Sequence, residues 1–228
     1  MTAILIATRH EASELLRRLS PVKREGIYHY RGTIAGKAAA LFLTRPGVYA
    51  PQQVRRFLML YRFDAVVHSG SCASLTAALT HLQPVIISTV TTPGEKNRII
   101  GQSGVSGVSL RHLVTTDNAK ADLREQTGAD VLDMETYTIA GIMAEPEFAA
   151  LPFSVIRVVD DLPGEESYLA KDMALRQLMS GTARTRPSVR EILRFGIWDY
   201  FVLKLRRRRV AREIFRQVKT ALASIPER

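Results

Sequence analysis

The sequence predicts an α/β fold, in which a central mixed, mostly parallel β-sheet is flanked by helices and followed by a C-terminal basic amphipathic helical extension. Two observations lead to this prediction. Short apolar runs alternate with longer amphipathic segments over residues 1–182, and from Ser188 onward apolar residues recur at helical spacing among arginines. Such alternation is typical of parallel strands covered by helices. With 228 residues, of which 46% are apolar, the chain is long enough for one well-buried domain.

The apolar runs and amphipathic segments define the expected elements in chain order. Strands are predicted at residues 3–7, 38–43, 64–68, 84–90 and 153–159. Helices are predicted at residues 11–19, 48–61, 118–125 and 136–143. Residues 91–107 are rich in Gly, Ser, Thr and charges, which predicts an excursion from the core or a loop over a site. Residues 162–164 suit a turn that leaves a strand end.

The positive charge of the chain is concentrated near its C-terminus. Residues 183–228 carry 13 Lys and Arg against 4 Asp and Glu, whereas residues 1–182 carry 19 against 18. We therefore divide the chain into a nearly neutral domain, residues 1–182, and a basic amphipathic helical tail, residues 183–228. The tail is expected to form one long helix, or two helices with a break near Gly196.

The tail has three alternative partners. Apolar residues on one side and clustered arginines on the other are what an anionic membrane surface requires. The same pattern fits a helix packed on its own domain or on a second copy of the chain in a homo-oligomer. Nucleic acid is ranked last, because the aromatic residues follow the apolar stripe and do not interleave with the arginines.

The cysteine content and the apolar runs indicate a cytoplasmic protein. Cys72 is the only cysteine, which excludes an internal disulfide and a cysteine-based metal site. The first apolar run, residues 3–7, is too short for a signal peptide, and no run approaches the roughly 18 residues of a membrane-spanning helix. The five histidines are scattered singly, so we expect no metal and no cofactor.

Polar residues that directly follow apolar runs are the candidates for a site, because ligands bind at the carboxyl ends of strands in such sheets. Five places satisfy this condition. They are residues 8–11, 44–47, 68–74, 133–135 and 160–161. The last two belong to the motifs V-L-D-M-E (residues 131–135) and I-R-V-V-D-D (residues 156–161).

These places, in this order and spacing, resemble the purine nucleoside phosphorylase and nucleosidase superfamily, which includes methylthioadenosine/S-adenosylhomocysteine nucleosidase. The resemblance covers about residues 1–180, and its most specific segments are G-S-C-A-S-L (70–75), D-M-E-T-Y-T-I-A (133–140) and P-F-S-V-I-R-V-V-D-D (152–161). It implies a nucleoside phosphorylase-like three-layer sandwich. The H-E-A segment and the span T-T-D-N-A-K-A-D-L-R-E-Q-T-G-A look closest to hopanoid-associated nucleosidases, which remove adenine from adenosylhopane.

The resemblance assigns three residues to the base and the sugar. Breaking a purine N-glycosidic bond leaves negative charge on the base, and Asp161 matches the acid that meets N7. A partly buried strand end beside Asp160 is expected to favour the neutral form of this acid. Glu135 matches the residue that holds the ribose hydroxyls, and Met134 the one that packs on the sugar. The alternatives are a turn-initiating Asp pair, a solvated first-turn glutamate and a core methionine.

The resemblance assigns the nucleophile side of the site as well. Glu11 matches the carboxylate that orients and deprotonates the attacking water, although Ala12 occupies the other position that can be aligned. The alternative is a helix-start glutamate. Ser71 and the Gly70 backbone match the segment beside the ribose, and Gly47 lies in the corresponding turn. Ala73 and Ser74 stand where the family usually has glycines, which narrows the room for a ligand.

We therefore predict an enzyme that hydrolyses the N-glycosidic bond of a 5′-substituted adenosine, with adenosylhopane as the preferred substrate taken from the inner face of the membrane. The first alternative is a phosphorylase. In phosphorylases an arginine usually precedes the G-S-C segment, and His68 stands near that place, with Arg9 and Arg45 nearby in sequence. The second alternative is a catalytically weak relative that binds a nucleoside-bearing lipid or partner, as Ala73 and Ser74 suggest.

Overall fold

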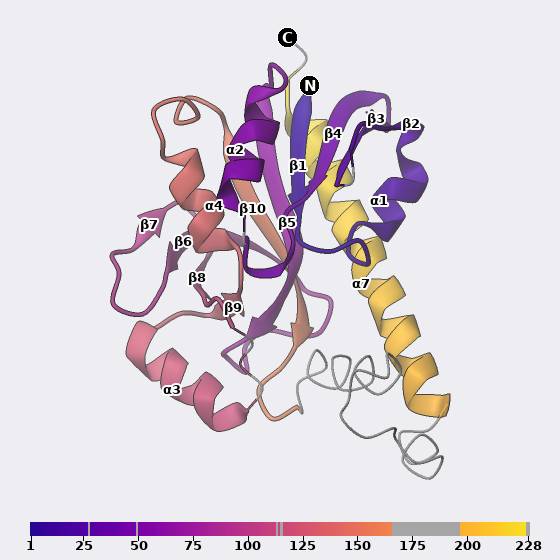
Figure 1. Cartoon of the computed structure of the whole chain (residues 1–228). Helices are drawn as coiled ribbons and strands as arrows, with labels where there is room; N and C mark the ends of the chain where they lie inside the picture. Colours follow the sequence, from indigo (N-terminus) through magenta and orange to yellow (C-terminus); the bar gives the residue numbers. More distant parts are fainter. Residues whose placement is uncertain (27, 49, 113, 115, 166–196, 227–228) are drawn as a thin grey trace, which may run out of the picture.

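Ten strands form one mixed sheet in the computed structural model of the chain (Figure 1), which describes residues 1–26, 28–48, 50–112, 114, 116–165 and 197–226. In order along the chain, the strands are Thr2–Ile6 (β1), Ser20–Arg24 (β2), His29–Ile34 (β3), Lys37–Leu43 (β4), Ala65–Ser74 (β5), Pro84–Thr91 (β6), Arg98–Ile99 (β7), Val105–Ser109 (β8), Val131–Asp133 (β9) and Phe153–Asp161 (β10). Their spatial order is β10-β6-β8-β9-β5-β1-β4-β3-β2, and β7 pairs with β6.

The sheet is mixed, as predicted, but it is not mostly parallel. Of the ten pairings among the described strands, five are parallel and five are antiparallel. The antiparallel pairings come from the β2–β3–β4 meander and from the contacts of β10 with β6, β5 with β9, and β6 with β7. Because β10 pairs with β5 as well as with β6, five strands close into a barrel-like ring.

The long strand β5 belongs both to the barrel-like ring and to the part of the sheet that contains β1, β4, β3 and β2. One of its edges pairs with β1 over residues 65–69 and with β9 over residues 73–74, while its other edge pairs with β10. Residues 70–72 of β5 therefore have no strand partner on the first edge. The ends of β1 and β9 diverge at this point, and such a switch in strand order is where ligands bind in α/β sheets.

Helices pack on both faces of the sheet. They are Ser13–Arg18 (α1), Pro51–Met59 (α2), Asp117–Thr127 (α3), Thr136–Met143 (α4) and Ile197–Ser224 (α7), with a 3-10 helix at Pro46–Val48 (η1). One core cluster packs Phe57 of α2 and Ile139 of α4 against Leu5 of β1. A second cluster packs Leu15 of α1 and Ile214 of α7 against the opposite face. This arrangement gives the expected three layers (Figure 1).

The segment predicted as an excursion or loop, residues 91–107, contains strand β7 and the start of β8. The prediction was therefore wrong for the residues of these two strands. Strand β8 has the sequence V-S-G-V-S, which carries little hydrophobic signal. A Cβ at Gly107 would lie 3.2 Å from the side chain of Ile87, so a larger residue would fit only if Ile87 shifted slightly. Strands β2, β3 and β9 were also not predicted. They are polar or short, and they form where they pair with neighbouring strands.

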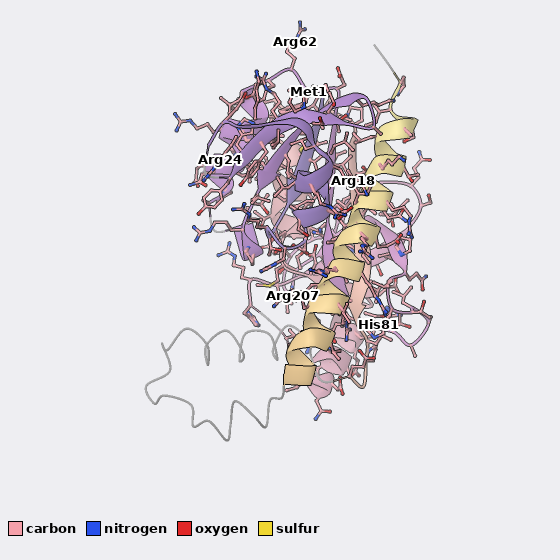
Figure 2. All side chains as sticks on the ribbon, turned by 90° about the vertical axis from the view of Figure 1, so that its right-hand side faces the viewer. Met1, Arg18, Arg24, Arg62, His81 and Arg207 are labelled. Atoms are coloured by element: carbon pink, nitrogen blue, oxygen red, sulfur yellow. The ribbon has the colours of Figure 1, made fainter. Side chains whose placement is uncertain are left out.

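Helix α7 packs on the domain along its C-terminal half. Val210, Ile214, Val218 and Leu222 are buried in the same cluster as the apolar residues of β1 and β4. Figure 2 shows α7 lying along this side of the molecule, and the guanidinium of Arg18 in α1 lies 5.9 Å from the ring of Phe215. The predicted break near Gly196 and the predicted boundary at residue 182 lie outside the described residues. None of the described helices is long and apolar enough to cross a membrane.

Truncating the buried face of α7 should destabilise the whole domain. Ile214 is fully buried, so we expect Ile214→Ala to lower the free energy of unfolding by about 2–5 kcal/mol. Val202, on the same helix, is 49% exposed, and Val202→Ala should change it by less than about 0.5 kcal/mol. Urea denaturation of both variants measures the difference. Equal midpoints for Ile214→Ala and the parent chain would show that α7 is not part of the cooperative core.

Candidate active site

A cavity of about 400 Å³ lies at the divergence of β1 and β9 along β5. Its wall includes five of the site residues that we predicted from the sequence, and they belong to four strands or to the turns that follow them. These residues are Glu11 after β1, Ser71 in β5, Met134 and Glu135 after β9, and Asp161 at the end of β10. Helix α7 contributes Arg207 and Val210 to the same wall. Gly47 and Gly70 are not part of the wall, but each lies next to a wall carboxylate.

The carboxylate of Glu11 is held by four hydrogen bonds. Oε1 accepts from the backbone N–H and the hydroxyl of Ser71, each at 2.8 Å. Oε2 accepts from the N–H of Thr8 at 3.1 Å and from its hydroxyl at 2.8 Å. Four donors hold this carboxyl group in one orientation. Helix α1 begins two residues later, so Glu11 is not the first-turn helix residue that the alternative interpretation expected.

Glu135 is buried at the start of α4, with 6% of its surface exposed, and the alternative of a solvated helix residue is wrong. Its Oε1 accepts a hydrogen bond of 3.0 Å from the backbone N–H of Gly47. Gly47 has a φ of 71°, which glycine adopts without strain. Burial, with a smaller contribution from the negative charge of Asp133, raises the pKa of Glu135 to about 8. The carboxyl group is therefore largely protonated at neutral pH.

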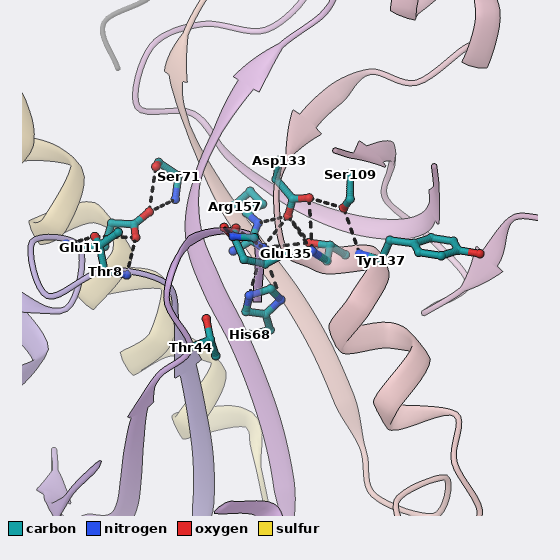
Figure 3. A network of polar contacts seen from close by, with 12 residues as sticks. Thr8, Glu11, Thr44, His68, Ser71, Ser109, Asp133, Glu135, Tyr137 and Arg157 are labelled. Carbon is teal, nitrogen blue, oxygen red and sulfur yellow. Dashed lines mark hydrogen bonds and ion pairs between the residues drawn. The ribbon is translucent and has the colours of Figure 1, made fainter. Parts of the chain in front are cut away.

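A buried guanidinium, that of Arg157 in β10, lies behind these carboxylates (Figure 3). Its Nε donates to Asp133 Oδ2 at 2.8 Å, and one Nη donates to the hydroxyl of Thr136 at 2.8 Å. The same Nη lies 3.8 Å from Glu135 Oε2. Although this is an ion-pair distance, the charge of Arg157 is already balanced by Asp133. The contact is therefore too weak to bring the pKa of Glu135 back to its ordinary value.

His68 is fully buried beside Arg157 and is not part of the cavity wall. Burial, with a further contribution from the neighbouring guanidinium, lowers the pKa of His68 well below its usual range. A neutral ring nitrogen can then accept a hydrogen bond from Arg157 Nη2 at 3.1 Å. The structure therefore does not place His68 where an arginine would hold a phosphate in a phosphorylase.

Gly70 allows Arg157 and Glu11 to approach the same point of β5. A Cβ at this position would lie 2.8 Å from Arg157 Nη1 and 3.1 Å from Glu11 Oε1. The first distance is shorter than real contacts of a Cβ atom, so a side chain would push one of these charged groups out of place. The missing side chain of Gly70 thus leaves space for the side chains of Arg157 and Glu11.

Asp161 has two differently placed carboxyl oxygens. Oδ2 accepts a hydrogen bond of 3.1 Å from Nζ of Lys120 in α3. Oδ1 is buried and has no hydrogen-bond partner in the described part of the chain. We expected burial beside Asp160 to favour the neutral form of Asp161. The structure places the ammonium of Lys120 beside this acid, an ion-pair contact that the sequence did not reveal.

Asp160, the neighbour of this acid, connects β10 to α7. Its Oδ1 accepts from Arg206 Nε at 2.9 Å, and Arg206 also lies 3.4 Å from Glu165. His81, labelled beside α7 in Figure 2, lies 2.8 Å from the same Glu165 carboxylate. Burial raises the pKa of Asp160 to about 6, although Arg206 opposes this shift. The Asp160–Asp161 pair is therefore more than a turn, because each carboxylate has a separate cationic partner.

Two residues that stand where the resembled family usually has glycines, Ala73 and Ser74, have different effects on the cavity. Ala73 is part of the wall, so its methyl group occupies space there. Ser74 is fully buried, and its hydroxyl donates to the carbonyl of Thr76 at 2.7 Å and accepts from the Thr76 N–H. Only the first of these side chains narrows the cavity.

From the sequence we did not predict Lys120, Arg157 or Arg207 as site residues. An arginine inside a run of β-branched residues, as in S-V-I-R-V-V, is the one signal that was available for Arg157, because a charged residue in a buried strand must have a partner. No three His, Cys, Asp or Glu side chains are grouped as metal ligands in the part of the chain that the structure describes.

Solved structures share this fold at low sequence identity. A 5′-methylthioadenosine/S-adenosylhomocysteine nucleosidase from Borrelia burgdorferi, bound to adenine, is 18% identical, with a TM-score of 0.61 over 73% of this chain and 89% of that one. A nucleosidase of the same type from Chlamydia trachomatis, bound to MTA, is 15% identical, with a TM-score of 0.65 over 99% and 98%. A futalosine hydrolase mutant from Helicobacter pylori is 15% identical, with a TM-score of 0.58 over 69% and 88%.

No protein-family model matches the sequence, and a search of curated proteins finds no match. At 14–18% identity, the structural similarity establishes the fold alone. The chain therefore has the α/β fold of these nucleosidases.

Removing the charge of Glu135 should flatten the dependence of stability on pH. Since the pKa of Glu135 is raised from 4.5 to about 8, the folded state binds more protons than the unfolded state in this interval. Its contribution to stability is fully present below about pH 4.5 and is lost as the pH rises through 8. We expect the melting temperature of the parent chain to fall more steeply between pH 6 and pH 8 than that of Glu135→Gln, as measured by differential scanning fluorimetry. Parallel curves would contradict the assignment.

Proposed function

We propose that this protein is a purine nucleosidase, which hydrolyses the N-glycosidic bond of a 5′-substituted adenosine and releases adenine. The observation that carries this proposal is that Glu11, Glu135 and Asp161 line one cavity although they come from three different strand ends. Cleavage of this bond places positive charge on the ribose and negative charge on the departing base. Several separate acidic groups around one small cavity suit that distribution of charge.

In this proposal, Asp161 acts at the base. Its Oδ1 faces no protein donor in the described structure, so it is available to give a proton to N7 of the purine. Glu135 holds the ribose hydroxyls, and Met134 packs on the sugar. A protonated Glu135 can donate one hydrogen bond and accept another, which suits a pair of neighbouring hydroxyl groups. Glu11 is the general base that orients and activates the attacking water.

The hydrogen bonds around Glu11 favour water over phosphate as the nucleophile. The hydroxyl and N–H groups of Ser71 and Thr8 are the kind of donors that hold a phosphate, and all four donate to Glu11. An ionised Glu11 would also repel a phosphate anion. Phosphorolysis is the second candidate, and one observation favours it. Arg157 Nη1 is buried next to Gly70 and has no hydrogen-bond partner in the described structure.

We further propose adenosylhopane as the substrate, in hopanoid biosynthesis. The H-E-A segment after the first strand and the span before D-M-E support this choice through their similarity to the hopanoid-associated nucleosidases. The cavity also has apolar walls at Pro46, Val114, Leu132 and Val210, which suit a hydrocarbon substituent.

We place the enzyme in the cytoplasm, at the inner face of the membrane, with α7 as the element that contacts lipid. Val202 and Leu205 are 49% and 53% exposed, although they belong to the apolar stripe of this helix. Arg208, Arg209 and Arg212 are exposed within about two turns of Leu205. Arg207, on the same helix, is part of the cavity wall. A substrate that leaves the lipid beside α7 would therefore reach the cavity over a short path.

A panel of adenosine derivatives tests the proposed activity. Purified protein should release adenine from 5′-substituted adenosines without added phosphate, and Asp161→Asn should lower kcat by about 10²- to 10⁴-fold, since general acid catalysis contributes that much. Chromatography of the products provides the measurement, and Asp122→Asn, at an exposed position of α3, is the control. A ribose 1-phosphate product that requires phosphate would favour phosphorolysis. Ligand-induced stabilisation without any product would favour the catalytically weak relative.

Sedimentation with vesicles tests the membrane contact. The full chain should bind anionic vesicles and be released by high salt, because each Lys or Arg near such a surface contributes about 1 kcal/mol. The double change Val202→Ser and Leu205→Ser should weaken binding, whereas Met59→Ser, at another exposed apolar position on α2, should not. Equal sedimentation of all three proteins, or none, would contradict the proposed role of α7.

A further inference from the structure

Lys120 is the buried cation of α3, whereas the other charged residues of this helix are exposed or half-buried. Only 2% of its surface is exposed. A buried lysine needs a partner, and Nζ of Lys120 donates to Asp161 Oδ2 at 3.1 Å and to the carbonyl of Leu162 at 3.5 Å. A second contact joins the same two segments, because the N–H of Gly164 donates to Asp117 Oδ1 at 3.1 Å. Helix α3 thus holds the chain where it leaves β10.

These contacts determine which oxygen of Asp161 remains available. The register of β10 against β5 shifts between Val159 and Asp161, and such an irregularity redirects the side chain that follows it. Lys120 then occupies Oδ2, while Oδ1 stays buried, without a hydrogen-bond partner in the described structure, in a residue of the cavity wall. The carboxyl group has one oxygen fixed by the protein and one left for a ligand.

We propose that Lys120 is a positioning residue for the acid Asp161. It fixes the carboxyl plane so that Oδ1 faces the leaving purine, and it stabilises the carboxylate that remains after proton transfer. This inference rests on the proposed nucleosidase function. In the step itself, the C1′–N9 bond breaks with its electron pair moving to the purine, the Oδ1–H bond of Asp161 breaks, and an N7–H bond forms. The water that Glu11 deprotonates forms the new bond to C1′. Lys120 keeps its proton, and Asp161 regains one from solvent.

Other charges near Asp161 would also influence its protonation. Asp160 is its neighbour on β10, Arg206 binds Asp160 from α7, and Arg207 and His112 are part of the same wall. Glu11, Asp133 and Glu135 line the rest of the cavity. Lys120 differs from these residues because its Nζ forms an ion pair of 3.1 Å with Asp161. Its removal should therefore have a larger effect on this acid than the removal of a more distant charge.

The variant Lys120→Met keeps the length of the side chain and removes its charge. We expect it to lower kcat for adenine release by about 10- to 100-fold, as part of the contribution of the acid, with little change in KM. It should also move the descending limb of the pH–rate profile to higher pH, because the positive charge beside the acid is removed. A purely structural role for Lys120 would leave this limb in place.

The matched control is Arg124→Met, which removes another cation of α3 that pairs with an aspartate, Asp130, outside the cavity wall. It should leave the rate and the limb unchanged. In the background of Asp161→Asn, Lys120→Met should have no further effect on the rate. If Lys120→Met does not fold, Lys120→Gln, which keeps a donor without the charge, provides the same test.

The two proposals can fail separately. If the parent chain and Arg124→Met release adenine while Lys120→Met keeps both the rate and the limb, the positioning role is wrong and the nucleosidase function stands. If the parent chain releases no adenine, the proposed function has failed, and calorimetric titration with adenine tests the positioning role alone. Lys120→Met should then bind adenine at least about fivefold more weakly than Arg124→Met, and equal affinities would overturn the inference.

Discussion

The buried guanidinium of Arg157 is the interaction on which the arrangement of the site depends. A fully buried charge is tolerated only when it is paired and hydrogen-bonded, and Arg157 obtains its partners from three elements. Asp133 comes from β9, Thr136 from the first turn of α4, and His68 from β5. These contacts connect β10 to β9 and α4 across the point where β5 changes partners. The position of Glu135, between Asp133 and Thr136 in the chain, follows from them.

The same constraint explains why the acidic groups of the cavity differ in their surroundings. Arg157 is balanced by Asp133, so Glu135 remains in a buried environment without a cation of its own, and its pKa rises to about 8. Glu11 has four hydrogen-bond donors, and Asp161 has Lys120. Groups of the same type thus acquire different properties from their neighbours, as acid–base chemistry in one small cavity requires.

The sequence allowed the fold class and several residues of the cavity wall to be predicted, because both depend on local patterns. The apolar runs of β1, β4, β5, β6 and β10 were recognisable, and polar residues such as Glu11 and Asp161 directly follow or end such runs. The partners of these residues could not be predicted. Lys120 and Asp161 are 41 positions apart, and Arg157 and His68 are 89 apart, so only the folded sheet brings them together. The roles of the site residues stay predictions.

The raised pKa of Glu135 has a consequence for catalysis under the proposed function. Burial keeps the proton on this carboxyl group, because the charge of Arg157 is already balanced by Asp133 and only partly offsets the cost of burying an anion. As the glycosidic bond breaks, positive charge develops on the ribose, and this charge strengthens the hydrogen bonds that the sugar hydroxyls donate to the carboxyl group. The interaction is weak with the uncharged substrate and strong with the transition state. An enzyme accelerates its reaction only through interactions that differ in this way. Under the proposed function, Glu135 would therefore stabilise the transition state more than the bound substrate.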